Sequence, residues 1–299
     1  MSYQLYHGDC LETLKTFASE SINCCVTSPP YFGLRDYGVD GQIGMEHTPD
    51  DFVNSLVTVF REVRRVLKDD GTLWVNLGDS YSAHKDCKSI GQSLAKGTTR
   101  ENAHVIEKGK SRTRDSKMLK SVGLKNKDLI GIPWMVAFAL RADGWYLRSD
   151  IIWSKPNPMP ESVQDRPTKA HEYIFLLSKS QSYYYDNEAI AEPAAYDGRK
   201  DTFMKGSNKY ADNFLPCAQS TNTLHASGHE RWKTNENGDR IRNKRTVWTV
   251  TTKPYKEAHF ATFPEEIPRT CILAGSKKGD TILDPFSGAG TTGVVADDQ

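Results

Sequence analysis

Several common sequence features are missing, and each absence excludes a kind of binding site or a cellular location for the protein. The six cysteines among the 299 residues show no C-x-x-C pair and no metal-ligand spacing, so we expect neither a zinc site nor a disulfide framework. No apolar run approaches the roughly 18 residues of a membrane-spanning helix. The N-terminal segment MSYQLYHGDC has no basic region followed by an apolar one. We therefore expect no secretory signal, no membrane partner and a cytoplasmic location.

Net charge is also nearly absent, but the charges are unevenly distributed. The chain has 39 basic and 38 acidic residues, a formal net charge of +1. Two polar stretches, 80–127 and 186–256, are nevertheless rich in lysine and arginine. The first lacks apolar periodicity and predicts either a flexible insertion or a loop that contacts phosphates. The second interleaves basic residues with tyrosine and tryptophan, which is typical of nucleic-acid binding, and we expect 186–245 to be a recognition insert.

Apolar periodicity outside these stretches predicts alternating strands and helices. Helical spacing is clear over 50–67, 128–143 and 264–274. Short apolar runs bounded by turn residues predict strands at 72–77, 145–153, 172–178 and 280–284. This alternation indicates an α/β protein with a parallel sheet and helices outside it.

The stretch Thr27-Ser28-Pro29-Pro30-Tyr31 follows the buried run 22–26. Two consecutive prolines fix φ and lack N–H groups, so the chain is expected to leave the sheet as a stiff bend. Carbonyl groups at Ser28 and Pro29 beside the ring of Tyr31 suit a planar ligand that carries an amine, such as a nucleobase. The alternative is a simple proline turn with Tyr31 covering the core.

A glycine-rich turn, DPFSGAGTTG at 284–293, follows the last predicted strand and opens a helix. Glycine allows a backbone to approach a ligand closely. Alone, such a turn is compatible with a dinucleotide, a phosphate or no ligand.

Together, DPFSGAGTT and TSPPY resemble the amino-group DNA methyltransferases, which use S-adenosyl-L-methionine. The order of the two motifs, with an insert between them, is that of the beta class. Further segments also resemble the family: QLYHGDCLETL, DGTLWVNLGDSY, and the stretches from WYLRSDIIW to FLLSKS and from HFATFPEE to ILDPF. The resemblance covers most of the chain outside 80–127 and 186–245.

The resemblance implies a Rossmann-like methyltransferase fold with a mostly parallel, twisted sheet, helices on both faces and a circularly permuted motif order. It implies a catalytic domain at 1–185 and 246–299, interrupted by the flexible basic insertion 80–127, and a target-recognition insert at 186–245.

The resemblance also implies which residues bind the cofactor. The glycine turn would hold its methionine part, a segment near 260–264 would close over the same pocket, and Asp9 would approach the adenine end. A helix cap for Asp9 and core packing for Phe263 are the structural alternatives. The implied cofactor residues are Asp9, Thr27, Phe260, Thr262, Phe263, Pro264, Asp284, Phe286, Gly288, Gly290, Thr291 and Thr292.

For catalysis the resemblance implicates Ser28, Pro29, Pro30 and Tyr31, which would hold and stack on the amine-bearing base of a flipped nucleotide. Serine at this position is typical of the family's N4-cytosine enzymes and aspartate of its N6-adenine enzymes. We therefore expect N4-cytosine methylation, with N6-adenine as the alternative. Residues expected to line the target-base pocket are Phe32, Trp153, Ser154 and Lys155.

The resemblance breaks off at 297–299, before a strand whose acidic end holds the cofactor ribose in the family. A second function is therefore considered, a DNA-binding protein with little or no methylation activity. Methylation of RNA or a small molecule is a third. The expected partner is double-stranded DNA, in a bacterial, archaeal or phage-infected cell. A second copy of the chain and a cognate restriction endonuclease are further partners that the resemblance brings into consideration.

Overall fold

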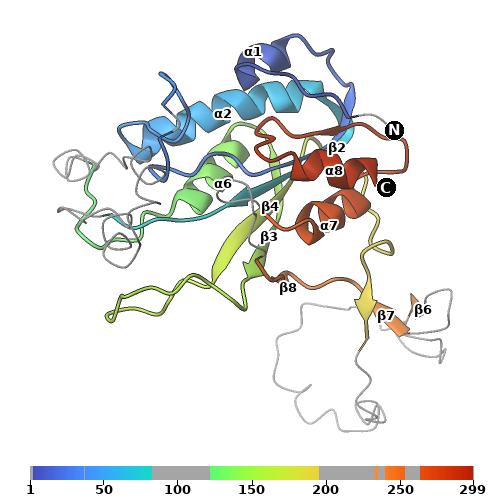
Figure 1. The fold of residues 1–299 in the computed structure, drawn as a ribbon. Helices are drawn as coiled ribbons and strands as arrows, with labels where there is room; N and C mark the ends of the chain where they lie inside the picture. The colour runs from blue at the N-terminus through green and yellow to red at the C-terminus, as the bar shows by residue number, and fades with distance from the viewer. Residues whose placement is uncertain are drawn as a thin grey trace, which may run out of the picture. The chain divides into compact units, whose positions relative to one another are not determined.

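The computed structural model describes residues 3–36, 38–82, 122–194, 233–234, 240–252 and 263–298. They belong to two compact units: Met1–Asp186 with Arg245–Gln299, and Asn187–Lys244. The larger unit is built on a six-stranded sheet with the order β8-β3-β4-β2-β1-β9 (Figure 1). Its strands are β1 (Ile22–Thr27), β2 (Leu67–Leu77), β3 (Tyr146–Ser154), β4 (His171–Ser178), β8 (Val247–Thr249) and β9 (Ile282–Leu283). Its helices are α1 (Cys10–Lys15), α2 (Pro49–Val66), α6 (Ile132–Ala142), α7 (Glu266–Gly275) and α8 (Thr291–Asp297).

The sheet is mostly parallel, as the sequence predicts. Strand β1 pairs in parallel with β2 and β9, and β3 pairs in parallel with β8. Strand β4 runs against both β2 and β3. The connection 155–170 between β3 and β4 contains no helix, whereas a parallel return needs a crossover connection. As a result, the first residues of β4 lie at the same sheet edge as the last residues of its neighbours.

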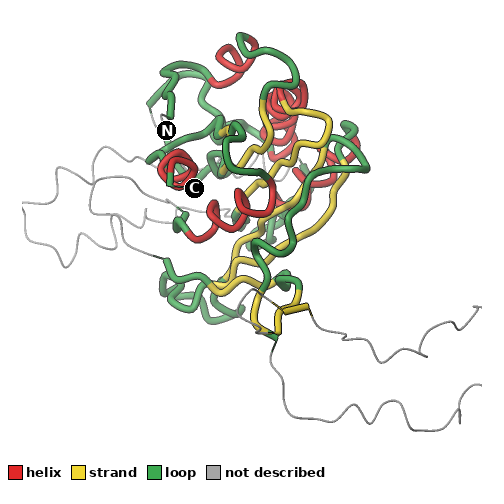
Figure 2. The backbone as a smooth tube through the Cα atoms, turned by 90° about the vertical axis from the view of Figure 1, so that its right-hand side faces the viewer, coloured by secondary structure: helices red, strands yellow, loops and turns green. Residues whose placement is uncertain are grey.

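Helices cover both faces of the sheet (Figure 2). Alternate side chains along each strand point to the same face of the sheet. On one face these side chains, among them Cys25, Leu73 and Val75, belong to the main apolar core together with helices α2 and α6. On the other face, a Cβ added at Gly275 of α7 would lie 2.6 Å from the Thr72 Oγ1 and 2.9 Å from the Cys24 Sγ. Helix α7 therefore packs so closely on β1 and β2 that a side chain larger than glycine does not fit at its last turn.

Helix α2 illustrates how the sequence fixes these elements. Thr48 is its N-cap and accepts a hydrogen bond from the Asp51 N at 3.1 Å, and Pro49 occupies the first turn. Phe52 and Phe60 are fully buried, and each such side chain contributes on the order of 2 kcal/mol. The next strand starts directly at Leu67, earlier than the predicted 72, because Leu67 already pairs with Ile22 of β1.

The predicted insertion 80–127 lies outside the described residues over 83–121. Its two ends meet just after β2. The Ser82 N donates to the Asp128 O and the Lys127 N donates to the Ser82 O, both at 2.8 Å. The insertion therefore leaves and rejoins the larger unit at one place.

The smaller unit has a three-stranded antiparallel sheet with the order β5-β7-β6. Its strands are β5 (Glu192–Pro193), β6 (Lys233–Thr234) and β7 (Arg240–Arg242). The Arg242 Nε lies 2.9 Å from the Glu192 Oε1, which joins β7 to β5. The residues 195–232 and 235–239 of the predicted recognition insert lie outside the described residues.

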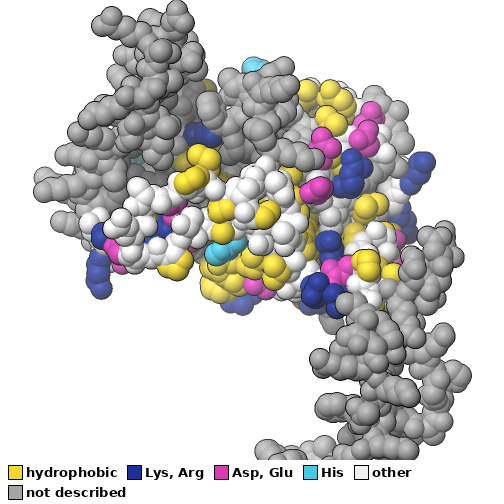
Figure 3. Space-filling view, turned by 60° about the horizontal axis from the view of Figure 1, so that its bottom comes forward, with side chains coloured by type: hydrophobic (Ala, Val, Ile, Leu, Met, Phe, Trp, Pro, Cys, Tyr) yellow, Lys and Arg dark blue, Asp and Glu magenta, His cyan; other side chains and the backbone are white. Residues whose placement is uncertain are grey.

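Surface charge of the described residues is mixed. On the face drawn in Figure 3, apolar, basic and acidic side chains are interspersed. Most basic residues that predict a nucleic-acid surface fall in 83–121 and 195–232, outside the described residues. Within the described part of the chain, no helix is long and apolar enough to cross a membrane.

Candidate active site

A cleft of about 2330 Å³ opens where β1 and β9 end. The carboxyl ends of neighbouring parallel strands are the usual place for a ligand in an open α/β sheet. The cleft is lined by the start of α1, the bend after β1, and the turn between β9 and α8. The lining segments include 3–10, 28–31, 39–43 and 276–293.

Asp284 joins three elements at the floor of this cleft. The Thr27 Oγ1 donates to its Oδ1 at 2.6 Å, the Thr292 Oγ1 donates to its Oδ2 at 2.8 Å, and the Phe286 N donates to its Oδ1 at 3.0 Å. Burial raises the pKa of the Asp284 carboxyl, and the hydrogen bonds from Thr27, Thr292 and Phe286 partly oppose that rise. Asp284 thus fixes the ends of β1 and β9 and the first turn of α8.

The glycine turn exposes backbone to the cleft. Gly288 and Gly290 have φ values of +52° and +78°, which favour glycine. The Gly290 N donates to the Ser287 O at 2.7 Å. No heavy atom outside the adjacent chain lies within 4 Å of a Cβ built at Gly290. The turn therefore presents an open backbone surface on which a ligand can lie.

The other predicted cofactor residues fall into three groups. Asp9 lines the cleft and also caps α1, where its Oδ1 accepts from the Glu12 N at 3.0 Å. Phe263 and Phe286 line the cleft as well, whereas Thr27 and Pro264 are buried behind it. Phe260 and Thr262 lie outside the described residues.

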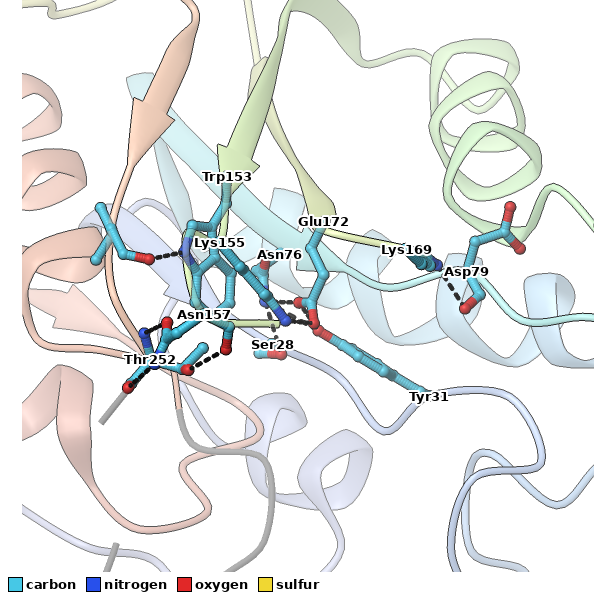
Figure 4. A network of polar contacts seen from close by, with 11 residues as sticks. Ser28, Tyr31, Asn76, Asp79, Trp153, Lys155, Asn157, Lys169, Glu172 and Thr252 are labelled. Carbon is cyan, nitrogen blue, oxygen red and sulfur yellow. Dashed lines mark hydrogen bonds and ion pairs between the residues drawn. The ribbon is translucent and has the colours of Figure 1, made fainter. Parts of the chain in front are cut away.

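A polar network adjoins the cleft at the bend that follows β1, where Ser28 and Tyr31 line it (Figure 4). The Asn76 Nδ2 lies 2.9 Å from the Tyr31 Oη, 3.0 Å from the Glu172 Oε2 and 3.5 Å from the Ser28 Oγ. The Tyr31 Oη donates to the Glu172 Oε2 at 2.5 Å. The Lys155 Nζ forms an ion pair with the Glu172 Oε1. The reversed direction of β4 places Glu172 beside Trp153 and near the end of β2.

The ring of Tyr31 is held in place by a glycine. A Cβ built at Gly78 would lie 2.6 Å from the Tyr31 Cε2. Burial raises the pKa of the Tyr31 phenol well above its ordinary value, and the negative charge of Glu172 adds to the rise. Hydrogen bonds from Ser28 and Asn76 oppose it. The phenol is therefore neutral and acts as the donor to Glu172.

The residues predicted to line a base pocket are divided by the structure. The Lys155 Nζ lies 4.2 Å from the centroid of the Trp153 ring, and the Trp153 Nε1 donates to the Val250 O at 2.9 Å. The carbonyl of Ser154 accepts from the Val250 N. Phe32 turns into the core, where it is 2% exposed and its ring lies 5.5 Å from that of Phe52. Lys155 is thus joined to the Ser28 network through Glu172. Trp153 and Phe32 are 3% and 2% exposed, and none of the four predicted residues is among those that line the cleft.

Asn76 and Glu172 were not singled out by the sequence. Each is a polar residue within or beside an apolar strand run, TLWVNL and EYIFLL, and this is the signal that could have identified them. Buried polar groups require hydrogen-bond partners, so a polar residue in such a run marks a network.

The two cysteines before the bend do not take part in the network. Burial raises the pKa of the Cys24 thiol to about 12 and that of the Cys25 thiol well above its ordinary value. The Cys24 Sγ lies 3.5 Å from the Thr72 Oγ1, on the face of the sheet covered by α7. Both thiols are therefore structural rather than nucleophilic.

Comparisons with known proteins agree on one protein family, the DNA methylases. A family model described as DNA methylase matches residues 22–299. The type II methyltransferase M.Cfr9I of Citrobacter freundii is 46% identical over 295 residues, which are 99% of this chain and 80% of that protein. The type II methyltransferase M.SmaI of Serratia marcescens is 46% identical over 294 residues, which are 98% of this chain and 82% of that protein.

Solved structures share the fold. The PvuII DNA methyltransferase (cytosine-N4-specific) matches with a TM-score of 0.59 at 17% identity and covers 98% of this chain and 77% of its own. A putative DNA modification methylase from Thermus thermophilus, solved with S-adenosyl-L-methionine, matches with a TM-score of 0.52 at 20% identity and covers 97% of this chain and 81% of its own.

Proposed function

The chain belongs to the DNA methylase family of N6 and N4 enzymes, and we propose that it transfers a methyl group from S-adenosyl-L-methionine to the N4 amine of cytosine in duplex DNA. The observation that carries this proposal is the position of Ser28. Ser28 lines the same cleft as the glycine turn and Asp284. An acceptor for an amine and a surface for a cofactor thus share one cleft.

The residues of the cleft fit the cofactor. The open backbone at Gly290 leaves space for a ligand, and the buried carboxyl of Asp284 receives only uncharged donors from the described residues. Asp284, Phe286, Gly288, Gly290 and Thr291 would hold the methionine part, and Asp9 would lie toward the adenine. The cofactor supplies, when bound, an electrophilic methyl group on a positively charged sulfur. An acidic, open cleft suits that charge.

Ser28 and Pro29 prepare the amine. The lone pair of an exocyclic base amine is delocalised into the ring, so the amine is a weak nucleophile. Hydrogen bonds from its N–H groups to the Ser28 Oγ and the Pro29 carbonyl would orient the nitrogen and favour tetrahedral geometry, an effect mainly of positioning. The target base must leave the duplex to reach them, and Tyr31, which lines the cleft, provides aromatic surface at that place.

The choice of cytosine over adenine rests on Ser28. A neutral serine occupies the position at which the family's adenine enzymes typically have aspartate. The structural neighbour from the PvuII system is described as cytosine-N4-specific, which supports the same choice. The alternative is methylation at N6 of adenine.

We further propose that 186–245 reads the target sequence, because base-edge contacts from side chains provide specificity. The two relatives named above are type II methyltransferases, so a cognate restriction endonuclease is the proposed partner, and a second copy of the chain is another.

Substitution of Ser28 by alanine tests the proposal. With tritiated cofactor and genomic DNA, wild-type protein is expected to label DNA, and nucleoside chromatography is expected to place the label in N4-methylcytosine. The S28A variant is expected to lose at least about 100-fold in rate while it retains calorimetric cofactor binding. Thr58→Ala removes a hydroxyl from the exposed face of α2 and is the matched control. Near-normal labelling by S28A contradicts the proposed role of Ser28.

A further inference from the structure

We propose that Glu172 is a positioning residue for the methyl-transfer reaction: its charge acts on Ser28 through the phenol of Tyr31 and makes the Ser28 oxygen a better acceptor for the amine proton. The inference rests on the proposed function and adds to it a residue that touches neither substrate nor cofactor. It assigns a use to the buried ion pair between Glu172 and Lys155.

The direction of each hydrogen bond follows from the chemistry of the groups. A carboxylate that is paired with Lys155 can only accept, so Tyr31 donates its O–H to the Glu172 Oε2 at 2.5 Å. The Tyr31 oxygen then has its lone pairs left for the Asn76 Nδ2 at 2.9 Å and for the hydroxyl of Ser28. In the proposed arrangement the Ser28 hydroxyl is directed toward the Tyr31 oxygen, and its own lone pairs are left to accept.

One lone pair of the Ser28 Oγ faces the Asn76 Nδ2 across 3.5 Å, which is a long contact. The remaining acceptor capacity is available to an amine N–H that enters from the cleft, since Ser28 is among the residues that line it. Asn76 is 3% exposed, and its Nδ2 contacts the Ser28 Oγ, the Tyr31 Oη and the Glu172 Oε2. Asn76 therefore holds the side chains of Ser28, Tyr31 and Glu172 in position relative to one another.

The series of hydrogen bonds from Glu172 through Tyr31 to Ser28 can transmit the effect of the charge, because each bond polarises the next. Hydrogen bonds to ionised groups are roughly twice as strong as neutral ones. Cooperative chains in a low-dielectric interior strengthen each bond by roughly 10 to 30%. The side chains of Glu172 and Lys155 are only 14% and 18% exposed, so solvent screens this charge weakly.

The same series of hydrogen bonds provides a route for the proton that the reaction releases. When the amine nitrogen uses its lone pair to bond the methyl carbon, the electrons of the broken carbon–sulfur bond stay on sulfur and the nitrogen becomes positive. It then gives one N–H proton to the Ser28 Oγ and keeps the electron pair of that bond. Ser28 gives its proton to Tyr31, and Tyr31 gives its proton to Glu172. Glu172 ends as a neutral carboxyl, while Ser28 and Tyr31 are regenerated.

Charged groups face Glu172 from each element that surrounds it. Lys155 follows β3 and forms the direct ion pair. Lys169 precedes β4, and its Nζ donates to the Asp79 O at 2.6 Å. The carboxylate of Asp79 turns away to accept from the Gly131 N and the Ile132 N at the start of α6. Tyr31 completes the set. Glu172 is therefore the acid whose carboxylate contacts Tyr31 and Asn76.

The competing role for Glu172 is purely structural, since its ion pair also closes the base of the connection between β3 and β4. A structural role and a transmitted charge differ in how substitutions combine. If Glu172 acts through Tyr31, removing either one breaks the same chain, so their effects on rate do not multiply.

The experiment compares E172Q, Y31F and the double variant under single-turnover conditions with saturating DNA and cofactor. Each single variant is expected to lower the methylation rate by about 10 to 100-fold, and the double variant is expected to be no slower than the slower single one. Calorimetric cofactor binding and the urea midpoint are expected to stay near wild type.

Glu161→Gln is the matched control, because Glu161 pairs with Arg166 in the same connection at 2.7 Å without joining the network. The E161Q variant is expected to show the wild-type rate. A wild-type rate in E172Q, or losses that multiply in the double variant, would overturn the proposal. If E172Q does not fold, Y31F decides alone, and a wild-type methylation rate in Y31F would overturn the proposal. A wild-type protein that methylates no DNA would instead reject the proposed function, which is a separate outcome.

Discussion

Two partly buried carboxylates lie on either side of the residue pair Thr27-Ser28, and they are stabilised in opposite ways. Asp284 receives hydrogen bonds from two hydroxyls and one backbone N–H, and none of these donors is charged. Glu172 receives an ammonium group, a phenol and an amide. The first site therefore keeps an uncompensated acidic group at a cleft, whereas the second has its counter-ion built in.

We call the surroundings of Asp284, with Thr27, Phe286 and Thr292, the Asp284 side, and those of Glu172, with Tyr31, Asn76 and Lys155, the Glu172 side. The difference in how their carboxylates are stabilised corresponds to the two proposed ligands. A cofactor with a positive charge can complete the electrostatics of the Asp284 side. The Glu172 side must accept a neutral base without rearranging its charges, because unpaired charge in a protein interior is costly. Both sides meet at the last residue of β1, where Thr27 contacts Asp284 and the adjacent Ser28 faces Asn76.

The largest expected effect comes from removing the counter-ion. Lys155→Met leaves the carboxylate of Glu172 buried without its ammonium partner, and we expect a loss of about 3 kcal/mol in the free energy of unfolding. Urea unfolding monitored by circular dichroism measures this loss. Lys127→Met breaks an ion pair in which Lys127 and Asp165 are 73% and 54% exposed, so this matched control is expected to leave the midpoint nearly unchanged. Equal losses in the two variants would contradict the comparison.

A smaller loss of stability is expected when alanine replaces Gly78 on the Glu172 side or Gly290 on the Asp284 side. At Gly78 a methyl group would meet the ring of Tyr31 at 2.6 Å, so we expect about 2 kcal/mol of destabilisation and a slower methylation rate. At Gly290 the space is open but φ is +78°, so we expect about 1 kcal/mol from backbone strain and weaker cofactor binding.

Chemical unfolding, cofactor calorimetry and single-turnover rates separate these two expectations. The comparison fails if Gly78→Ala weakens cofactor binding and leaves the methylation rate of the saturated enzyme unchanged. It also fails if Gly290→Ala shows the reverse pattern.

The smallest expected effect is a pH dependence on the Asp284 side. Burial raises the pKa of Asp284 in the folded protein above its ordinary value of 3.8. The folded state therefore binds more protons than the unfolded state in the window above 3.8, and the free energy of unfolding falls as pH rises through it. In the Asp284→Asn variant this contribution is absent. The difference in stability, wild type minus variant, is expected to decrease as pH rises from about 4 toward neutrality.

Unfolding of both proteins in urea at several pH values gives this difference directly. A difference that increases with pH would mean that the hydrogen bonds from Thr27, Thr292 and Phe286 outweigh burial.

The two sides also differ in how far sequence could predict them. The Asp284 side is a continuous stretch, 284–293, so its glycines and acid can be read in order. The Glu172 side is assembled from four separate segments. Glu172 reaches Ser28 only because β4 runs antiparallel to its neighbours, and periodicity in the sequence carries no information on strand direction. Phe32 follows the bend directly in sequence but turns into the core, because it packs on Phe52 of α2.

The central claim is that this protein methylates N4 of cytosine in duplex DNA. It is tested most directly by expressing the protein in a host free of DNA methylation and sequencing the genome with a method that detects both N4-methylcytosine and N6-methyladenine. We predict N4-methylcytosine at one recurrent sequence, and its loss when Ser28 is replaced by alanine. N6-methyladenine at a recurrent sequence, or an unmodified genome, would contradict the claim.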